Sequence, residues 1–296
     1  MSLARPLLNA WLRLTEKRWL AREQDPVALR RSFEVKARLF FHAPRGTGFA
    51  RESLAGVPVQ WVAARGVLRE AGPAIVYFHG GSYVFGSSDT HRAMLGRLSA
   101  EAGLPACLPD YRLAPEHPFP AAVEDGLAVW RALAARSGGV ILGGDSAGGG
   151  LALALLAEGL RQGLPPPRGL FAFSPLTDLA LAGESLRQNA RADVVLPASR
   201  AGEVAALYLK GAAADDPRAS PLYADFTGAP PVWLVVGDTE ILRDDTRRMA
   251  ARLRAQGVAV TERIAGDLPH VWPIFHNILP EARASLRDVA EWIRSL

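Results

Sequence analysis

The sequence predicts an α/β fold in which a mostly parallel sheet of about eight strands carries helices on both faces. Short, unbroken apolar runs alternate with stretches of helical periodicity over most of the 296 residues, which is the pattern of repeated strand–helix units. The runs are rich in β-branched and aromatic residues, as in buried parallel strands. One run, Val140-Ile141-Leu142, leads through glycines into Ser146 and then into an Ala- and Leu-rich helical stretch. These observations predict a central sheet with a sharp strand-to-helix turn at Ser146.

Taken in order, the chain begins with helical spacing of Leu and Trp up to about residue 45, with Pro6 and Pro26 near the predicted helix starts. Residues 49–64 alternate apolar and polar around a Gly-Val-Pro turn and predict two antiparallel strands. The remaining predicted strands are 74–78, 104–108, 140–142, 169–173, 231–236 and 259–264. The predicted helices are 90–102, 124–135, 151–160, 246–256 and 281–293.

Two segments interrupt the strand–helix alternation, namely residues 1–45 and 184–211. Both read as helical, and in open α/β sheets ligands bind at the carboxyl ends of the strands. We therefore expect the two segments to form a helical cap over that edge that selects the ligand, with residues 46–183 and 212–296 forming the α/β core. The alternative, that these helices are decoration without a role at a site, stays open at this point.

The composition is that of a soluble globular protein, with 49% apolar and 22% charged residues. The net charge is +4, and the basic residues, mostly Arg, are scattered without interleaved aromatics, so nucleic-acid binding is not expected. Cys107 is the single cysteine, which excludes an intrachain disulfide and fits a reducing compartment. No apolar run is long enough for stable membrane insertion, and the N-terminus lacks the apolar core of a signal peptide. A cytoplasmic location is expected.

The turn Gly144-Asp145-Ser146-Ala147-Gly148 has the form of a nucleophile elbow. A side chain held in a strained turn needs neighbours without bulk, and Gly144 and Gly148 let strand and helix approach closely. Ser146 then projects its hydroxyl at the positive end of the helix. A plain strand-to-helix turn or a phosphate-binding glycine loop would show the same short pattern. Residues elsewhere in the chain are needed to distinguish these interpretations.

Acyl transfer through a serine also needs a base, a carboxylate that orients the base, and amides that hold the oxyanion. His270 is the candidate base, in a loop after the last predicted strand. Candidate oxyanion amides are those of Gly80, Gly81 and Ser82, which follow an upstream strand, and of Ala147, directly after the nucleophile. The chain order of serine, acid and histidine is that of α/β-hydrolases.

With these motifs together, the chain resembles the hormone-sensitive-lipase-like esterases, the bacterial family IV of lipolytic α/β-hydrolases. The resemblance spans about residues 75–275. The motifs that carry it are His79-Gly80-Gly81-Ser82-Tyr83, Asp110-Tyr111-Arg112-Leu113-Ala114-Pro115-Glu116, Gly144-Asp145-Ser146-Ala147-Gly148-Gly149, Ser220-Pro221-Leu222 and Pro269-His270.

The resemblance implies an α/β-hydrolase fold and a serine carboxylesterase that acts on esters of short to medium acyl chains without metal or cofactor. Ser146 would be the nucleophile and His270 the general acid and base. Ser82 stands where the family usually has a third glycine, and its backbone N–H serves if its φ and ψ allow. Asp110, Arg112 and Glu116 are read as a structural network that positions the oxyanion turn. A homodimer through the edge strand, about residues 259–264, is implied by the resemblance alone.

The triad acid has two candidates, Glu240 and Asp238. The family carries an Asp, then Pro-Leu, then an acidic pair in this stretch. Aligning Leu242 and Asp244-Asp245 without gaps places Glu240 at the catalytic position, and a glutamate is chemically sound there. Asp238 would then hold the turn by accepting backbone N–H groups.

Other activities fit the same residues. An amidase, an arylacetamide-type deacetylase or a lactonase would use the same triad on a different bond. A non-catalytic ligand receptor on this fold is the reading from another class. Receptors that resemble the family have lost the histidine, whereas His270 is present here, which favours an enzyme.

Overall fold

The computed structural model describes residues 2–70 and 72–296. Met1 and Ala71, which fall in the predicted segments 1–45 and 46–183, lie outside the described residues. The eight strands are β1 (Gly48–Leu54), β2 (Val57–Ala63), β3 (Ala74–Phe78), β4 (Ala106–Pro109), β5 (Val140–Asp145), β6 (Gly169–Phe173), β7 (Val232–Gly237) and β8 (Val260–Ala265). The α-helices are α1 (Ala4–Leu14), α2 (Glu16–Leu20), α3 (Pro26–Phe40), α4 (Ser88–Ala102), α5 (Ala121–Leu133), α6 (Ser146–Arg161), α7 (Ser185–Gln188), α8 (Ala201–Leu209), α9 (Arg243–Ala255) and α10 (Pro280–Ser295). Short 3-10 turns are η1 (Ala198–Arg200), η2 (Pro221–Tyr223) and η3 (Trp272–Phe275).

The strands form one sheet in the order β1-β2-β4-β3-β5-β6-β7-β8. β1 pairs with β2 and β2 with β4 in antiparallel register, and all other pairs are parallel. Successive parallel strands have to be joined by crossovers, and helices supply them. The predicted α/β class and mostly parallel eight-stranded sheet are confirmed.

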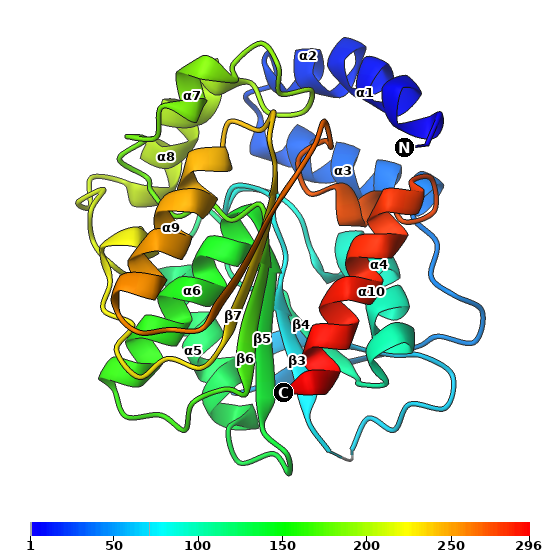
Figure 1. Ribbon diagram of the computed structural model, residues 1–296, viewed down its shortest axis with the longest axis vertical. Helices are drawn as coiled ribbons and strands as arrows, with labels where there is room; N and C mark the ends of the chain where they lie inside the picture. The colour runs from blue at the N-terminus through cyan, green and yellow to red at the C-terminus, as the bar shows by residue number, and fades with distance from the viewer. Residues whose placement is uncertain (1, 71) are drawn as a thin grey trace.

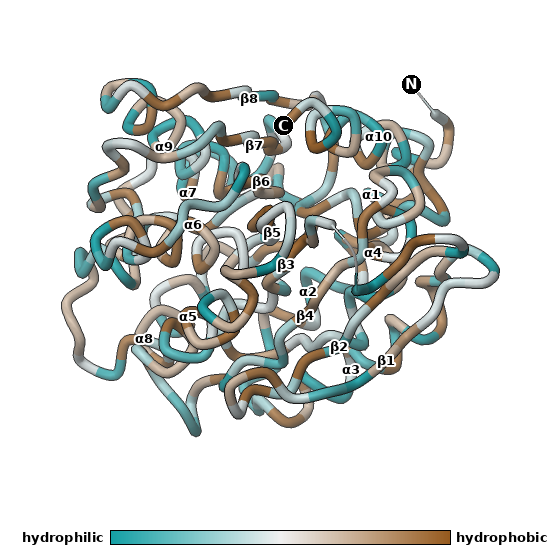
Figure 2. The backbone as a smooth tube through the Cα atoms, turned by 90° about the horizontal axis from the view of Figure 1, so that it is seen from below, coloured by the Kyte–Doolittle hydropathy of each residue, from teal (hydrophilic) through white to brown (hydrophobic). Residues whose placement is uncertain are grey.

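The two faces of the sheet carry two separate cores. On β3, Val76 and Phe78 belong to the core on one face, whereas Ile75 and Tyr77 belong to the core on the other. Successive side chains of a strand point to opposite faces, so an unbroken apolar run signals burial on both. Helices α5, α6 and α9 cover one face, and α4 and α10 cover the other, as the view along the sheet shows (Figure 2).

The N-terminal helices α1, α2 and α3 lie beyond one end of the central strands, with α7 and α8 beside them (Figure 1). Polar contacts join the two segments. Lys17 donates to the carbonyls of Ala190 and Asp193 at 2.7 and 2.5 Å, and Arg200 donates to the carbonyls of Leu20 and Glu23 at 3.2 and 2.6 Å. The two segments that interrupt the strand–helix alternation in the sequence are therefore neighbours in space.

The expectation of a helical segment over residues 184–211 is only partly right. α7 ends at Gln188, and helical structure resumes at Ala198. Pro197 accounts for part of this break, because the residue before a proline is disfavoured in the helical region. The Asp193 carboxylate also accepts from the backbone N–H groups of Val195 and Leu196, each at 2.8 Å, which holds a turn in place of a helix.

Within the described residues, none of the helices combines the length and apolar character required to cross a bilayer.

Candidate active site

Ser146 lies at the junction between β5 and α6, with φ of 52°. This left-handed conformation is strained for a residue with a side chain and marks the elbow. A Cβ on Gly144 would lie 2.3 Å from the Gly148 carbonyl oxygen, and one on Gly148 would lie 2.1 Å from the Phe78 carbonyl oxygen. Both positions therefore require glycine for the close approach of strand and helix.

His270 is brought to the nucleophile by the loop between β8 and η3. Its Nε2 lies 3.0 Å from Ser146 Oγ, within the range for a nucleophile and its base. Both residues are 7% exposed, so the serine–histidine contact is shielded but open to the cavity described below. The next residue, Val271, has φ of 51°, which shows that the loop is constrained where it presents the imidazole.

Glu240 completes the chain of contacts. Its Oε2 lies 2.6 Å from His270 Nδ1, and its Oε1 accepts from Ser174 Oγ at 2.8 Å and from the Gly237 N–H at 2.6 Å. The side chain is 1% exposed. Three donors therefore hold a buried carboxylate in one orientation, which fixes the imidazole with Nε2 towards the serine.

Asp238, the other candidate acid, faces solvent and has a different partner. Its Oδ1 accepts from the backbone N–H of Asp267 at 2.7 Å, and its own N–H donates to the Ala265 carbonyl at 2.9 Å. It thus joins the turn after β7 to the turn after β8. The structure places Glu240, and not Asp238, against His270.

The electrostatic setting favours a proton on His270. Burial alone would lower the pKa of His270, but the negative charge of Glu240 and its hydrogen bond to the ring raise that pKa above its ordinary value. An imidazole stabilised in this way is a stronger base towards the serine hydroxyl.

The predicted set of oxyanion donors needs one correction, because the N–H of Gly80 is already engaged. It donates to Asp145 Oδ1 at 3.0 Å, and a Cβ on Gly80 would lie 2.2 Å from Asp145 Oδ2. The glycine is needed for this close approach to the aspartate, and its amide is engaged by the aspartate carboxylate. Gly80 anchors the turn and does not supply a free donor.

Three amides remain free to face an oxyanion: those of Gly81, Ser82 and Ala147. Among the residues that the structure describes, no group accepts a hydrogen bond from the N–H of Gly81 or Ser82. Ser82 takes φ of 57°, so the serine adopts the left-handed conformation that the usual glycine would. Ala147 lies in the first turn of α6, where backbone N–H groups have no partner within the helix.

Asp145 ties the elbow to the oxyanion turn. Besides the Gly80 N–H, its carboxylate accepts from Tyr77 Oη at 2.9 Å and lies 3.2 Å from His91 Nε2. Burial opposes ionisation of Asp145, but the charge of His91 and the hydrogen bonds from His91 and Tyr77 outweigh it and lower its pKa. His79 stacks on Tyr111 with ring centroids 4.3 Å apart. Burial and the neighbouring His91 lower its pKa to about 4.

Asp110, Arg112 and Glu116, which were predicted to form one network around the oxyanion turn, make three separate sets of contacts. Asp110 accepts from the backbone N–H and the hydroxyl of Ser88 at 2.6 and 2.9 Å, at the start of α4. Arg112 pairs with Asp125 on α5. Glu116 pairs at 2.6 Å with Arg30 of α3.

Arg30 also joins that third anchor to the chain beyond the oxyanion turn, because its guanidinium donates to the Val84 carbonyl at 2.9 Å. Asp110 and Glu116 thus act on the segment that follows the oxyanion turn and not on the turn itself, whereas Arg112 contacts α5.

Two residues at the site were missed in the sequence. Ser174 donates to Glu240 and follows β6 directly, so the tendency of ligands to bind at the carboxyl ends of parallel strands could have marked it. Asn189 donates to the carbonyls of Asp238 and Glu240 at 2.9 and 2.8 Å. No local pattern marks Asn189, because its partners lie about fifty positions further along the chain.

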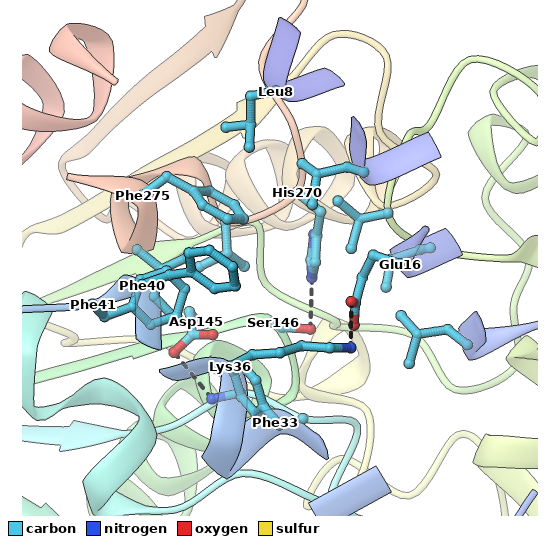
Figure 3. Close-up of a pocket in the computed structure, with 18 of the residues that line it drawn as sticks. Leu8, Glu16, Phe33, Lys36, Phe40, Phe41, Asp145, Ser146, His270 and Phe275 are labelled. Carbon is cyan, nitrogen blue, oxygen red and sulfur yellow. Dashed lines mark hydrogen bonds and ion pairs between the residues drawn. The ribbon is translucent and has the colours of Figure 1, made fainter. Parts of the chain in front are cut away.

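Two cavities meet at Ser146. The larger, about 420 Å³, is lined by aromatic and aliphatic side chains of α1 and α3 and of η3. Figure 3 shows Phe33, Phe40, Phe41 and Phe275 around the contact between His270 and Ser146. The smaller, about 100 Å³, lies towards α7 and α8 and is lined mainly by leucines. A serine at the junction of two apolar cavities can react with a substrate that has a non-polar group on each side.

Known proteins share this architecture. A family model described as alpha/beta hydrolase fold matches residues 75–274. An esterase of Acinetobacter venetianus is 35% identical over 98% of this chain and 94% of its own. An acetyl-hydrolase of Streptomyces hygroscopicus is 37% identical over 77% of each chain. The crystal structure of an esterase from the bacterial hormone-sensitive lipase family is 37% identical, covers 100% of this chain and 98% of its own, and superposes with a TM-score of 0.92. The chain belongs to the α/β-hydrolase family, in its hormone-sensitive-lipase-like branch.

Proposed function

We propose that this protein hydrolyses carboxylic esters through an acyl-enzyme formed on Ser146. One observation carries the proposal: Ser146, His270 and Glu240 form a continuous hydrogen-bonded chain at the floor of an apolar cavity, opposite three backbone amides. The chemistry fits acyl transfer, because nucleophile, base, orienting acid and oxyanion donors all converge on one point. The similarity to an esterase and an acetyl-hydrolase supports a carboxylic ester as the substrate.

In the first half-reaction, Ser146 Oγ attacks the ester carbonyl while His270 Nε2 takes the hydroxyl proton. The carbonyl oxygen becomes an oxyanion and accepts hydrogen bonds from the amides of Gly81, Ser82 and Ala147, which are preorganised and partly desolvated. The imidazolium that forms is stabilised by Glu240. Collapse of the tetrahedral intermediate expels the alcohol oxygen, which receives from His270 Nε2 the proton that came from Ser146, and the group leaves as the alcohol.

The second half-reaction repeats these steps with water. His270 takes a proton from a water molecule that attacks the acyl carbonyl, and the same amides hold the second oxyanion. Ser146 is then expelled, receives the proton and is regenerated, and the carboxylic acid is released. His270 carries each proton between serine, leaving group and water, while Glu240 and the backbone amides stabilise the charges that form, so we propose a reaction without metal or cofactor.

We propose further that residues 1–45 and 184–211 act as a cap. Their helices line the two cavities at Ser146, and the contacts of Lys17 and Arg200 join the segments to each other. This arrangement supports a role in excluding water and selecting substrates.

A homodimer through β8 is a separate proposal. β8 is the terminal strand of the sheet and pairs with β7 on one side, so its other edge has backbone groups available for a second copy. Light scattering in solution tests this directly.

We propose a cytoplasmic location, because the single cysteine is a buried thiol and fits a reducing compartment.

The test is hydrolysis of p-nitrophenyl butyrate by the purified protein, with Ser146→Ala as the matched control. We expect turnover by the unmodified protein, and a loss of several orders of magnitude in the variant with an unchanged circular dichroism spectrum. Near-normal turnover by Ser146→Ala would overturn the proposal.

A further inference from the structure

The two cavities differ greatly in size, and the position of His270 assigns a role to each. Of the described residues around the nucleophile, Ser82 and Ser146 line both cavities, whereas His270 lines the larger one and not the smaller. This inference rests on the proposed function, because it assumes that Ser146 attacks and His270 protonates the leaving group.

We infer that the larger cavity binds the alcohol portion of the ester and the smaller one the acyl portion, so that the preferred substrates are short-chain esters of large, uncharged, apolar alcohols. The alcohol oxygen has to receive its proton from His270 Nε2, so the group attached to that oxygen must lie on the histidine side. The acyl group remains on Ser146 after the alcohol has left. It must extend away from the histidine, because the attacking water enters beside the histidine. The smaller cavity lies on the side away from the histidine.

The smaller cavity, here the acyl arm, limits the acid by its volume and its walls. Its 100 Å³ is lined by leucines that include Leu176, Leu179 and Leu186, together with Val204 of α8. A dry apolar cavity of about 150 Å³ holds a six-carbon ring, so the acyl arm has room for roughly four carbon atoms. Leu179 is buried, so accommodating a longer chain would require displacing packed side chains.

The larger cavity, here the alcohol arm, has the size of a site for a drug-sized ligand. Its 420 Å³ is lined by Phe33, Phe40 and Phe275 among other apolar side chains. Its charged side chains are paired with each other. Lys36 Nζ lies 2.6 Å from Glu16 Oε2 (Figure 3), and the Asp145 carboxylate is paired with His91. The alcohol arm therefore offers a large apolar surface with compensated charges, which suits a neutral alcohol.

The helices of the two proposed cap segments contribute unequally to the arms. Among the described residues, α1 lines the alcohol arm and not the acyl arm, whereas α7 and α8 line the acyl arm and not the alcohol arm. Leu20 and Leu196, one from each segment, line both arms. α1 then bears on which alcohol is accepted, and α7 and α8 bear on the length of the acid.

Constitutional isomers test this assignment without changing substrate hydrophobicity. Hexyl acetate, butyl butanoate and ethyl hexanoate have the same molecular formula, and only the position of the ester group along the chain differs. Each methylene that an apolar site accommodates changes kcat/KM by about fourfold. The butanoyl group still fits the acyl arm and the hexanoyl group does not, so we expect hexyl acetate and butyl butanoate to have similar kcat/KM and ethyl hexanoate to be at least tenfold below both.

Two matched variants assign the preference to the arms. Leu186→Ala widens the acyl arm and should raise kcat/KM for ethyl hexanoate at least fivefold, while hexyl acetate changes less than twofold. Leu7→Ala makes the same substitution in the alcohol arm and should bring no gain for ethyl hexanoate.

The outcomes separate this inference from the proposed function. Ethyl hexanoate cleaved as fast as hexyl acetate, or a gain for ethyl hexanoate in Leu7→Ala and not in Leu186→Ala, would overturn the assignment of the arms while p-nitrophenyl butyrate is still hydrolysed through Ser146. Failure to hydrolyse p-nitrophenyl butyrate would instead overturn the proposed function and the assignment with it.

Discussion

Glu240 Oε2 lies 2.6 Å from His270 Nδ1, while the carboxylate of Asp238, two residues earlier, points to solvent. The difference follows from the turn after β7. The Gly237 N–H and Ser174 Oγ both donate to Glu240, so the longer side chain folds back under the imidazole. The glutamate thus receives the partners that define an orienting acid, and the aspartate is left to join two turns.

Substitution of the two acids side by side distinguishes these roles. Glu240→Gln keeps the size of the side chain and removes the charge that stabilises the imidazolium, so kcat should fall by roughly 10²–10⁴-fold with little change in KM. Asp238→Asn keeps an acceptor for the Asp267 N–H and should retain kcat within about threefold, because Asp238 does not reach His270. Steady-state kinetics on p-nitrophenyl butyrate measures both. A crippled Asp238→Asn beside a near-normal Glu240→Gln would reverse the assignment.

The dependence of activity on pH should report His270. The enzyme needs a neutral imidazole to accept the serine proton, and Glu240 raises the pKa of His270. The acidic limb of kcat/KM should therefore have its midpoint above pH 6.5, the ordinary value for histidine. In Glu240→Gln, burial remains without the compensating charge, so the midpoint should move to lower pH. A midpoint that stays in place in this variant would show that the limb belongs to another group.

Ser146 and His270 should act as a unit. Each single substitution to alanine removes the same nucleophilic pathway, so each should reduce kcat by several orders of magnitude. The double variant Ser146→Ala/His270→Ala should be little slower than either single one. Additive losses would indicate that the two residues contribute independently and would contradict the proposed mechanism.

The candidate site was predictable from sequence where a local pattern carries it. Ser146 is marked by glycines that its own turn requires, and His270 by a loop after the last strand. Glu240 needed the spacing to Asp244-Asp245. Gly80 was wrongly included as a donor, since the direction of its amide is set by Asp145, 65 positions further along the chain. Asn189 was missed for the same reason, because its contacts are long-range.

The fold divides in the same way. Buried parallel strands such as β3 are unbroken apolar runs, so their positions follow from the sequence alone. Residues 184–211 look helical by composition. In the structure, however, Pro197 and the hydrogen bonds that the Asp193 carboxylate accepts divide them into two short helical segments. A side chain that hydrogen-bonds to the backbone competes with the hydrogen bonds of a helix, and hydrophobic periodicity does not reveal this competition.

Removal of residues 1–20 tests the contribution of α1 and α2. Leu8 and Leu12 of α1 are buried in one of the two cores, and burial of two leucines is worth roughly 3–6 kcal/mol. The deletion should lower Tm by about 5–10 °C and flatten the dependence of kcat/KM on alcohol length. Calorimetry and the isomeric ester series measure the two effects. Leu3→Ala is the control, because Leu3 is 87% exposed and its loss should leave Tm unchanged. An unaltered Tm and length profile in the deletion would refute a role for these helices at the site.

The most direct measurement of the central claim is covalent labelling with diethyl p-nitrophenyl phosphate, which traps an activated serine as a stable phosphate ester. The protein should release one equivalent of p-nitrophenolate per chain, lose its esterase activity in proportion, and carry a single diethyl phosphate on Ser146 in the peptide mass spectrum. Ser146→Ala should release no stoichiometric burst. Attachment of the phosphate to another residue with loss of activity, or an equal burst from Ser146→Ala, would contradict the claim that this serine is the nucleophile.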